Sequence, residues 1–154
     1  MTFDQITPMQ EISIDGFQVV SGSMFAHMPR SMRPTCTIWP DSICFSKYSI
    51  YMLNNCENVR IEVNTAKRCM LIVPVTSGDR DGVRWAKLKK QDIEARKLDC
   101  KQFTMPLYEA WGWDRANVYR ATGQLVTADK KVMLLFDFSY PENWKGRGLE
   151  KANG

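Results

Sequence analysis

The residues of this sequence that could support metal binding are few and widely spaced. Five cysteines are present, none of them in a CxxC pair: Cys36, Cys44, Cys56, Cys69 and Cys100. Their separations are 8, 12, 13 and 31 residues, and His27 is the only histidine. A zinc site needs clustered thiolate or imidazole ligands, so the spacing predicts no metal and no other cofactor. The odd count favours packed, reduced thiols over a disulfide framework.

Residue patterns typical of an active site are also missing. The stretch "SGSMF" (21–25) is not a GxSxG nucleophile elbow, although His27 follows it closely. Pro40-Asp41 and Glu62 resemble the start of a metal-nuclease motif, but the lysine that should follow is absent. No glycine-rich loop could hold a phosphate. We therefore expect a protein that is not an enzyme.

The net charge of +4 is concentrated in one segment. Residues 1–75 carry six basic and six acidic side chains, whereas residues 80–101 carry eight basic and four acidic ones. Such a segment attracts phosphate groups or an acidic protein face, although a solvated linker has the same composition. The candidate nucleic-acid-binding residues are Arg80, Arg84, Trp85, Lys87, Lys89, Lys90, Arg96 and Lys97.

Short β-strands dominate the elements that must position these residues. "EISIDGFQVV" (11–20) has Asp15-Gly16 between two alternating runs, which predicts an N-terminal β-hairpin over 11–25. Strands are predicted at 35–39 and 42–46, with a turn at Pro40-Asp41.

A short helix follows these two strands. Ser46 is a good N-cap, and Tyr48, Tyr51 and Met52 recur at helical spacing behind it. Asn54-Asn55 can end the helix, because asparagine tolerates left-handed backbone. Strands at 58–63 and 68–75 complete a β-β-α-β-β unit.

The remainder of the chain repeats this order. Strands are predicted at 83–88 and 95–100, and a hairpin at 117–126 and 131–138. Between them, residues 101–113 predict a helix with Phe103, Leu107, Tyr108 and Trp111 on one face, in which Pro106 delays the start or distorts the first turn.

The predicted fold is mainly β with two short helices (α+β), formed by duplicated β-β-α-β-β halves at 34–76 and 82–139. Together with the N-terminal hairpin the halves make one globular domain over 1–140. A polar tail, in which Trp144 could dock back, is expected over 141–154.

The first half, "PTCTIWPDSICFSKYSIYMLNNCENVRIEVNTAKRCMLIVP", resembles the swapped-hairpin β-barrel half of the AbrB-like family. The resemblance covers 34–75, and 83–138 more loosely. Proteins of the MraZ type carry two such halves in one chain, so it implies a pseudo-twofold monomer, or a homodimer, with a closed barrel. This sequence departs from the family pattern in two places. DNA-binding members place basic residues in hairpins and loops, whereas the turn Trp39-Pro40-Asp41 has no arginine. The predicted hairpin over 11–20 is an additional element that the family pattern lacks.

Two functions therefore stay open. The first is regulatory nucleic-acid binding through the basic segment. The second is a protein-binding inhibitor from a phage or other mobile element, anti-CRISPR-like, which blocks a host nucleic-acid-handling complex; five tryptophans suit such an interface.

No apolar run is long enough to span a membrane, and the N-terminus has no signal-like region, so a cytoplasmic location is expected.

Overall fold

The protein is mainly β with two short helices, as the sequence predicts. The computed structural model describes residues 11–20, 32–90 and 92–146. The helices are α1 (Lys47–Met52) and α2 (Lys101–Ala110). The strands of the described residues are β1 (Thr35–Trp39), β2 (Ser42–Phe45), β3 (Asn58–Asn64), β4 (Cys69–Pro74), β5 (Gly82–Arg84), β6 (Ala86–Lys89), β7 (Asp92–Ala95), β8 (Lys97–Asp99), β9 (Asn117–Ala128), β10 (Lys131–Asp137) and β11 (Glu142–Lys145).

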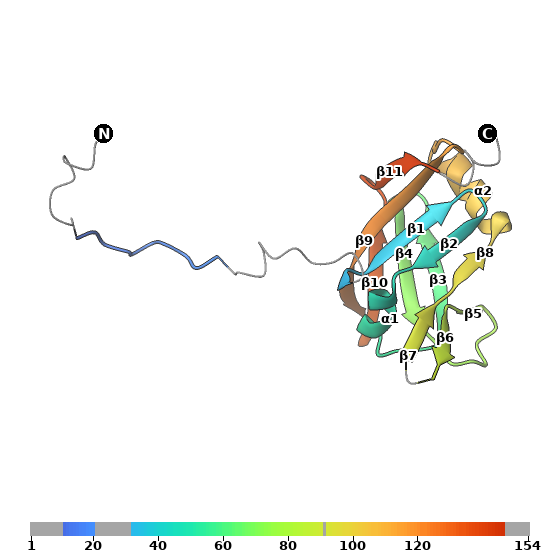
Figure 1. The fold of residues 1–154 in the computed structure, drawn as a ribbon, viewed down its shortest axis with the longest axis horizontal. Coiled ribbons are helices and arrows are strands. Elements are labelled where there is room, and N and C mark those ends of the chain that lie inside the picture. Colours follow the sequence, from blue (N-terminus) through green and yellow to red (C-terminus); the bar gives the residue numbers. More distant parts are fainter. Residues whose placement is uncertain (1–10, 21–31, 91, 147–154) are drawn as a thin grey trace.

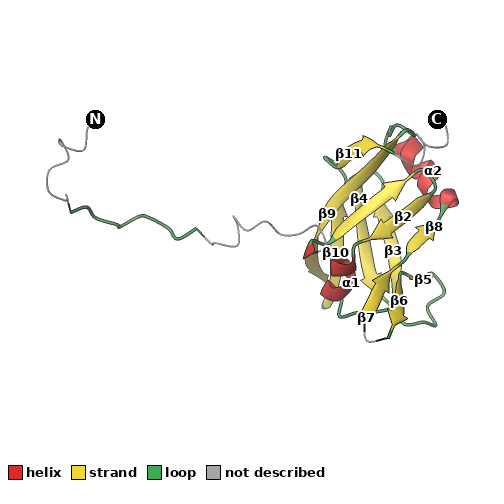
Figure 2. Cartoon of the chain, viewed as in Figure 1, coloured by secondary structure: helices red, strands yellow, loops and turns green. Residues whose placement is uncertain are grey.

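Nine of these strands form one strongly curled antiparallel sheet (Figures 1 and 2). Its order is β5-β3-β4-β10-β9-β1-β2-β8, and β11 pairs with β9. β6 and β7 form a separate two-stranded hairpin. The sheet curls into a half-barrel but does not close, because no pairing joins β5 to β8 in the described part of the chain. This open side is called the seam below.

The first β-β-α unit forms as its sequence predicts. Trp39 pairs with Ser42 across the turn at Pro40-Asp41. The Ser46 hydroxyl caps α1 by accepting from the Ser49 amide, and it also accepts a hydrogen bond from the Thr35 amide at 2.8 Å. Asn54 and Asn55 follow the helix with φ of 57° and 58°. These contacts lock α1 to the start of β1.

β9 and β10 form the longest hairpin of the sheet. Asp129 and Lys130 both have positive φ, 51° and 66°, which is the geometry of a type I′ turn that matches the twist of the strands. The second part of β9 pairs with β10, and its first part pairs with β1 on one edge and β11 on the other. β9 therefore joins the β5-β3-β4-β10 part of the curled sheet to the β1-β2-β8 part.

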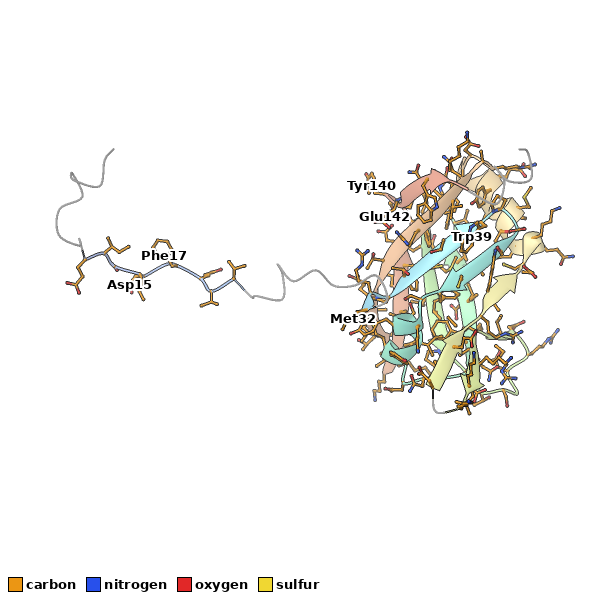
Figure 3. The ribbon with its side chains drawn as sticks, viewed as in Figure 1. Asp15, Phe17, Met32, Trp39, Tyr140 and Glu142 are labelled. Carbon is orange, nitrogen blue, oxygen red and sulfur yellow. The ribbon has the colours of Figure 1, made fainter. Side chains whose placement is uncertain are left out.

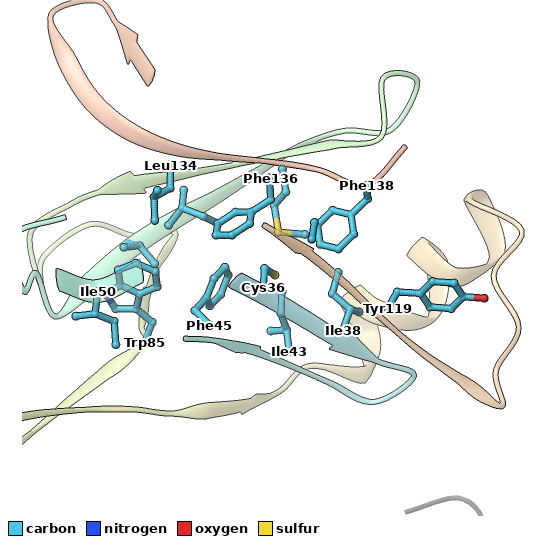
Figure 4. Close-up of a cluster of buried hydrophobic side chains, with 14 of the residues drawn as sticks. Cys36, Ile38, Ile43, Phe45, Ile50, Trp85, Tyr119, Leu134, Phe136 and Phe138 are labelled. Carbon is cyan, nitrogen blue, oxygen red and sulfur yellow. The ribbon is translucent and has the colours of Figure 1, made fainter. Parts of the chain in front are cut away.

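The concave face of the sheet holds the hydrophobic core (Figure 4). Alternate residues of β1 and β2, such as Cys36 and Ile38 or Ile43 and Phe45, point into it, as the period of a strand requires. Phe45 packs against Trp85 and Phe136, with ring centroids 5.2 Å and 5.8 Å apart. The largest of the fully buried core side chains are Trp85, Tyr108, Phe45, Phe136, Phe138, Ile38, Ile43, Ile50, Met70, Ile72, Leu134 and Val59.

α2 covers one end of the curled sheet. Its Thr104 hydroxyl donates to the Pro40 carbonyl at 2.7 Å, and the Trp111 indole donates to the Thr65 carbonyl at 3.0 Å. The predicted apolar face of this helix is confirmed: Leu107, Tyr108 and Trp111 are buried and Phe103 is half-buried. The predicted late start is wrong, because α2 begins at Lys101 with Pro106 inside it. The packing of these side chains offsets the amide hydrogen bond that proline cannot make.

The predicted N-terminal hairpin is absent over residues 11–20, and residues 21–25 lie outside the described part of the chain. A turn forms, with the Phe17 amide donating to the Ile14 carbonyl at 3.2 Å, but no strand flanks it. Gly16 has φ +87° whereas Asp15 does not have positive φ, so the turn is not the type I′ that a tight hairpin needs. Such a turn splays its two arms, and a hairpin with no packing partner is marginal in water.

A strand occurs where the sequence predicts a polar tail. β11 pairs with β9, with Trp144 opposite Val118, so the expected docking of Trp144 is confirmed. Arg120 holds this strand: its Nε donates to Glu142 Oε2 at 2.7 Å, and its guanidinium lies 4.8 Å from the Trp144 ring centroid. The predicted tail beyond 146 lies outside the described residues.

Candidate binding groove at the seam

Seven of the eight candidate residues of the basic segment lie on β5 to β8 or on the connections between them, and Arg80 lies in the turn before β5. The segment forms four short strands where the sequence predicts two, because breaks at Trp85 and Arg96 divide each predicted strand. Arg84 ends β5, Lys87 and Lys89 lie on β6, and Lys97 begins β8.

Trp85 cannot act as a base-stacking residue in this structure. Its side chain has no exposed surface, and its indole Nε1 donates to the Cys56 carbonyl at 2.7 Å. The break between β5 and β6 turns Trp85 toward Phe45 in the core. The assignment of Trp85 to a nucleic-acid surface is therefore corrected, because a fully buried ring presents no face to a base. The other seven candidates are exposed.

Acidic side chains are interleaved with the basic ones on the β6–β7 hairpin. Lys87 is opposite Glu94 in the register and Lys89 is opposite Asp92, while Lys89 Nζ lies 3.5 Å from Glu94 Oε2. On β5, Arg84 Nη2 lies 3.2 Å from Glu57 Oε2. These exposed ion pairs add little stability, but they reduce the net positive charge of the surface.

Asp92 anchors the hairpin to α1. Its carboxylate accepts hydrogen bonds from the Lys47 ammonium, from the Tyr51 hydroxyl at 2.9 Å and from the Ile93 amide at 2.8 Å. The bond from Lys47 lowers the pKa of Asp92 most, with help from the Ile93 amide and Tyr51, to about 2. Asp92 therefore positions the hairpin and is not available to an incoming ligand.

A groove of about 580 Å³ follows the seam. Both end strands of the sheet contribute to it, together with the start of α2. Its lining residues are Ile43, Ile61, Asp81, Val83, Arg96, Lys97, Leu98, Asp99, Cys100 and Phe103. The aliphatic and aromatic side chains form an apolar floor, and the charged residues of both signs stand at the rim. This combination is typical of a binding site that buries apolar groups and orients them through polar contacts.

The rim of the groove contains two of the predicted residues, Arg96 and Lys97. The Lys97 ammonium lies 4.7 Å from the ring centroid of Trp39, a cation–π contact on the outer face of the sheet. Asp81 and Asp99 accompany these cations, so the rim is mixed in charge. The structure therefore brings Arg96 and Lys97 into one site, whereas Lys87, Lys89 and Lys90 belong to the separate β6–β7 hairpin.

Cys100 contributes to the floor as a neutral thiol. Burial raises its pKa, and the nearby Asp99 and Asp41 carboxylates raise it further, to about 11. At neutral pH the thiolate fraction is therefore very small, and the thiol is a weak nucleophile. Cys100 therefore contributes apolar surface to the groove and no activated nucleophile.

Two free strand edges flank the groove. β5 pairs only with β3, and β8 pairs only with β2, in the part of the chain that the structure describes. The outer edge of each strand thus has backbone amides and carbonyls that a further strand can pair with. Sequence reasoning missed this groove. The apolar residues Val83 and Leu98 mark inward faces of short strands, but only the tertiary arrangement shows that β5 and β8 do not pair across the gap in the described chain. One backbone hydrogen bond, from the Arg96 amide to the Trp85 carbonyl at 3.1 Å, joins the segments beside them at one end.

Within residues 11–20, 32–90 and 92–146, no three His, Cys, Asp or Glu side chains come together as possible metal ligands. His27 and the "SGSMF" stretch lie outside these residues. The helices of the described chain are too short and too polar to cross a bilayer.

Comparisons with protein-family models, with curated protein sequences and with solved structures find no match for this chain.

Proposed function

We propose that this protein is a non-enzymatic binding protein that takes an extended segment of another protein along the seam. The observation that carries the proposal is the groove of about 580 Å³ between two end strands whose outer edges are unpaired. A strand added to such an edge gains main-chain hydrogen bonds, and pockets for alternate side chains give it specificity.

The chemistry of the groove favours a protein segment over nucleic acid. Its floor is apolar, with Ile43, Ile61 and Val83, and its rim carries Asp81 and Asp99 beside the two cations. Protein–nucleic acid interfaces are much more positively charged than this rim. An inhibitor from a phage or mobile element that docks on a host nucleic-acid-handling complex is one form that this binding role can take.

We also propose that the chain is a pseudo-twofold monomer of two related halves, in the manner of the AbrB-like and MraZ-type barrels. The pairing between the halves supports this proposal. β1 of the first half pairs with β9 of the second, and β5 of the second half pairs with β3 of the first. β4 and β10, the last hairpin strand of each half, pair with each other. Two interlaced copies predict such reciprocal pairing.

Peptide display against the full chain tests the proposed function. We expect the enriched peptides to alternate apolar and polar residues, and to lose at least about tenfold in affinity for Leu98→Glu, which places a charge on the groove floor. Arg96→Glu, at the exposed rim, provides a second groove variant if Leu98→Glu does not fold.

The matched control for these variants lies on another surface. Leu135 lines a separate depression of about 490 Å³ beside Leu71 and Val63. Leu135→Glu should leave peptide affinity unchanged. The proposed function is contradicted if the selection yields no peptides. It is also contradicted if the selected peptides bind Leu98→Glu and Arg96→Glu with the same affinity as the natural chain.

Nucleic-acid binding is the second candidate, and the β6–β7 hairpin favours it. Lys87 and Lys90 are exposed there, and neither is in an ion pair within the described residues. A mobility-shift titration with a DNA duplex and an RNA strand tests it. Binding should weaken steeply with salt and fall for Lys87→Ala with Lys90→Ala. Absence of a shift at low salt rules out this role.

The cysteines support a location in a reducing compartment such as the cytoplasm. All five thiols are free in the structure. Cys36 is fully buried in the core, where desolvation raises its pKa well above the usual value and keeps it protonated. Such packed thiols do not need an oxidising environment for stability.

A further inference from the structure

Residues 11–20 expose an unusual amount of apolar surface. All ten residues of this segment are exposed, and Figure 3 shows Asp15 and Phe17 well away from the sheet. Five large apolar side chains, from 56% exposed at Val20 to 98% at Val19, occur in these ten residues. Contiguous exposed apolar surface marks an interaction site. The members of this set are Ile12, Ile14, Phe17, Val19 and Val20.

The turn at Asp15-Gly16 would gather four of these side chains on one face. If the two arms come together, Ile14 is opposite Phe17 and Ile12 is opposite Val19, because paired residues of a hairpin share a face. The hydrogen bond from the Phe17 amide to the Ile14 carbonyl is already present. Closing the arms needs a change of φ at Asp15 to the type I′ turn, and a surface on which this apolar face can pack.

The seam groove supplies such a surface. Its floor is apolar, and the outer edges of β5 and β8 can each accept one more strand. The rim holds partners for the acidic residues of the segment: residues 11–20 contain Glu11 and Asp15 with no basic residue, and Arg96 and Lys97 stand at the rim beside Asp81 and Asp99. A strand in the seam would also remove the two free edges, which are otherwise prone to pair with other chains.

The connecting chain is long enough for the segment to reach the groove. Eleven residues, 21–31, separate Val20 from Met32, where the chain joins the sheet (Figure 3). At about 3.3 Å per residue this length spans up to about 36 Å. A domain of this size has a radius of gyration of about 13 Å, so the span covers its width.

We infer that residues 11–20 dock in the seam groove of their own chain, with Ile12, Ile14, Phe17 and Val19 toward the apolar floor. The arrangement in Figure 1 is then the open form of the protein. This inference rests on the proposed function, because an intramolecular occupant must compete with any external segment for the same groove. The protein would thus carry its own competitor for its binding site.

Amide hydrogen exchange on the full chain tests this inference. The double substitution Phe17→Ser with Val19→Ser removes apolar surface from an exposed segment, so it leaves the folded sheet intact. We expect exchange at residues 82–84 and 97–99 to quicken at least about tenfold in this variant, because the docked segment no longer protects the edges. Leu125→Ser with Val132→Ser, an apolar pair on β9 and β10 that is 46% and 49% exposed, is the control and should leave these amides unchanged.

A synthetic peptide of residues 11–20 provides the second measurement. It should bind the Phe17→Ser, Val19→Ser variant about tenfold more tightly than the natural chain, because the natural chain's own segment competes. Equal exchange in all three proteins, or equal or absent peptide binding, overturns the inference. Protection that increases with protein concentration also overturns it, since a second copy then supplies the segment.

The two proposals fail in different ways. If peptides selected by display bind the groove while the 11–20 peptide does not, this inference falls and the proposed function stands. If neither kind of peptide binds, both fall.

Discussion

The ring of Phe136 lies directly against the backbone of Gly123, its partner in the β9–β10 register. A Cβ at position 123 would be 2.6 Å from Cε1 and 2.9 Å from Cζ of this ring. Phe136 is fully buried and contacts Phe45, so the ring has no free space into which it can move. The close approach therefore places the curled part of β9 against the core.

We expect Gly123→Ala to destabilise the protein by about 1–3 kcal/mol, because overpacking forces the ring or the strand to shift. Urea unfolding measures this loss. Gly78→Ala is the control: a Cβ there meets no atom within 4 Å, so its effect should stay within about 0.5 kcal/mol. Equal stability of the two variants would show that β9 and β10 do not approach as described.

Trp85 is expected to stabilise the folded protein by its packing in the hydrophobic core. Trp85→Phe removes the indole that donates to the Cys56 carbonyl and leaves a void beside Phe45. The loss of a buried hydrogen bond and the void together should lower the free energy of unfolding by about 2–4 kcal/mol. Trp144→Phe, at the edge of β11, should cost less than about 1 kcal/mol in the same measurement. A Trp85→Phe protein as stable as the natural one contradicts the burial of this ring.

The Asp92 anchor predicts a dependence of stability on pH. Its pKa in the folded protein is about 2, below the value of about 3.9 in an unfolded chain. Between these values the unfolded state binds more protons, so stability rises with pH. The contribution is therefore complete above about pH 4 and is lost as pH falls toward 2.

Thermal unfolding of Asp92→Asn tests this dependence. The difference in Tm between the natural chain and the variant should be largest above about pH 5 and should shrink as pH falls toward 2. Glu109→Gln, a change of an exposed carboxylate on α2, controls for the general effect of charge removal. A difference in Tm that does not vary over this pH range would show that Asp92 does not hold α1 to the hairpin.

Arg120 is expected to hold β11 in place. Arg120→Met keeps the apolar stem but removes the hydrogen bond to Glu142 and the cation–π contact with Trp144. Exchange of the amides of residues 142–145 should quicken about fivefold, which corresponds to about 1 kcal/mol. Amides of β10 provide the internal reference and should not change. Unchanged exchange over 142–145 would show that backbone pairing alone keeps β11 on β9.

Local signals in the sequence predict most of the sheet. The strands predicted at 35–39, 42–46, 58–63 and 117–126 correspond to β1, β2, β3 and β9, and the serine at position 46 predicts the start of α1. The strands predicted at 68–75 and 131–138 correspond to β4 and β10. These features depend on neighbours in the chain, and such neighbours are visible in a sequence.

The features that sequence reasoning missed depend on distant contacts. Asp15-Gly16 predicts a turn correctly, but a hairpin also needs a packing surface, and none lies against residues 11–20 in the described structure. Glu142–Lys145 has no alternation because every residue of β11 is exposed, and only pairing with β9 makes it a strand. Trp85 lies among charged residues in the sequence, and its burial follows from the break between β5 and β6.

For the same reason, the seam groove was not predicted from the sequence. Arg96 and Lys97 do lie at the seam, but the apolar floor comes from five separate elements: β2, β3, β5, β8 and α2. Charge composition identifies a segment of the chain, whereas a groove requires the tertiary arrangement of several segments.

The central claim is that the seam between β5 and β8 is a binding groove for an extended protein segment. Amide exchange of the full-length Phe17→Ser, Val19→Ser chain, with and without a display-selected peptide, tests it without competition from the chain's own segment. Exchange at residues 82–84 and 97–99 should slow when the peptide binds, and exchange around Leu71 and Leu135 should not change. Protection confined to the Leu71–Leu135 surface, or none at either strand edge, would contradict it.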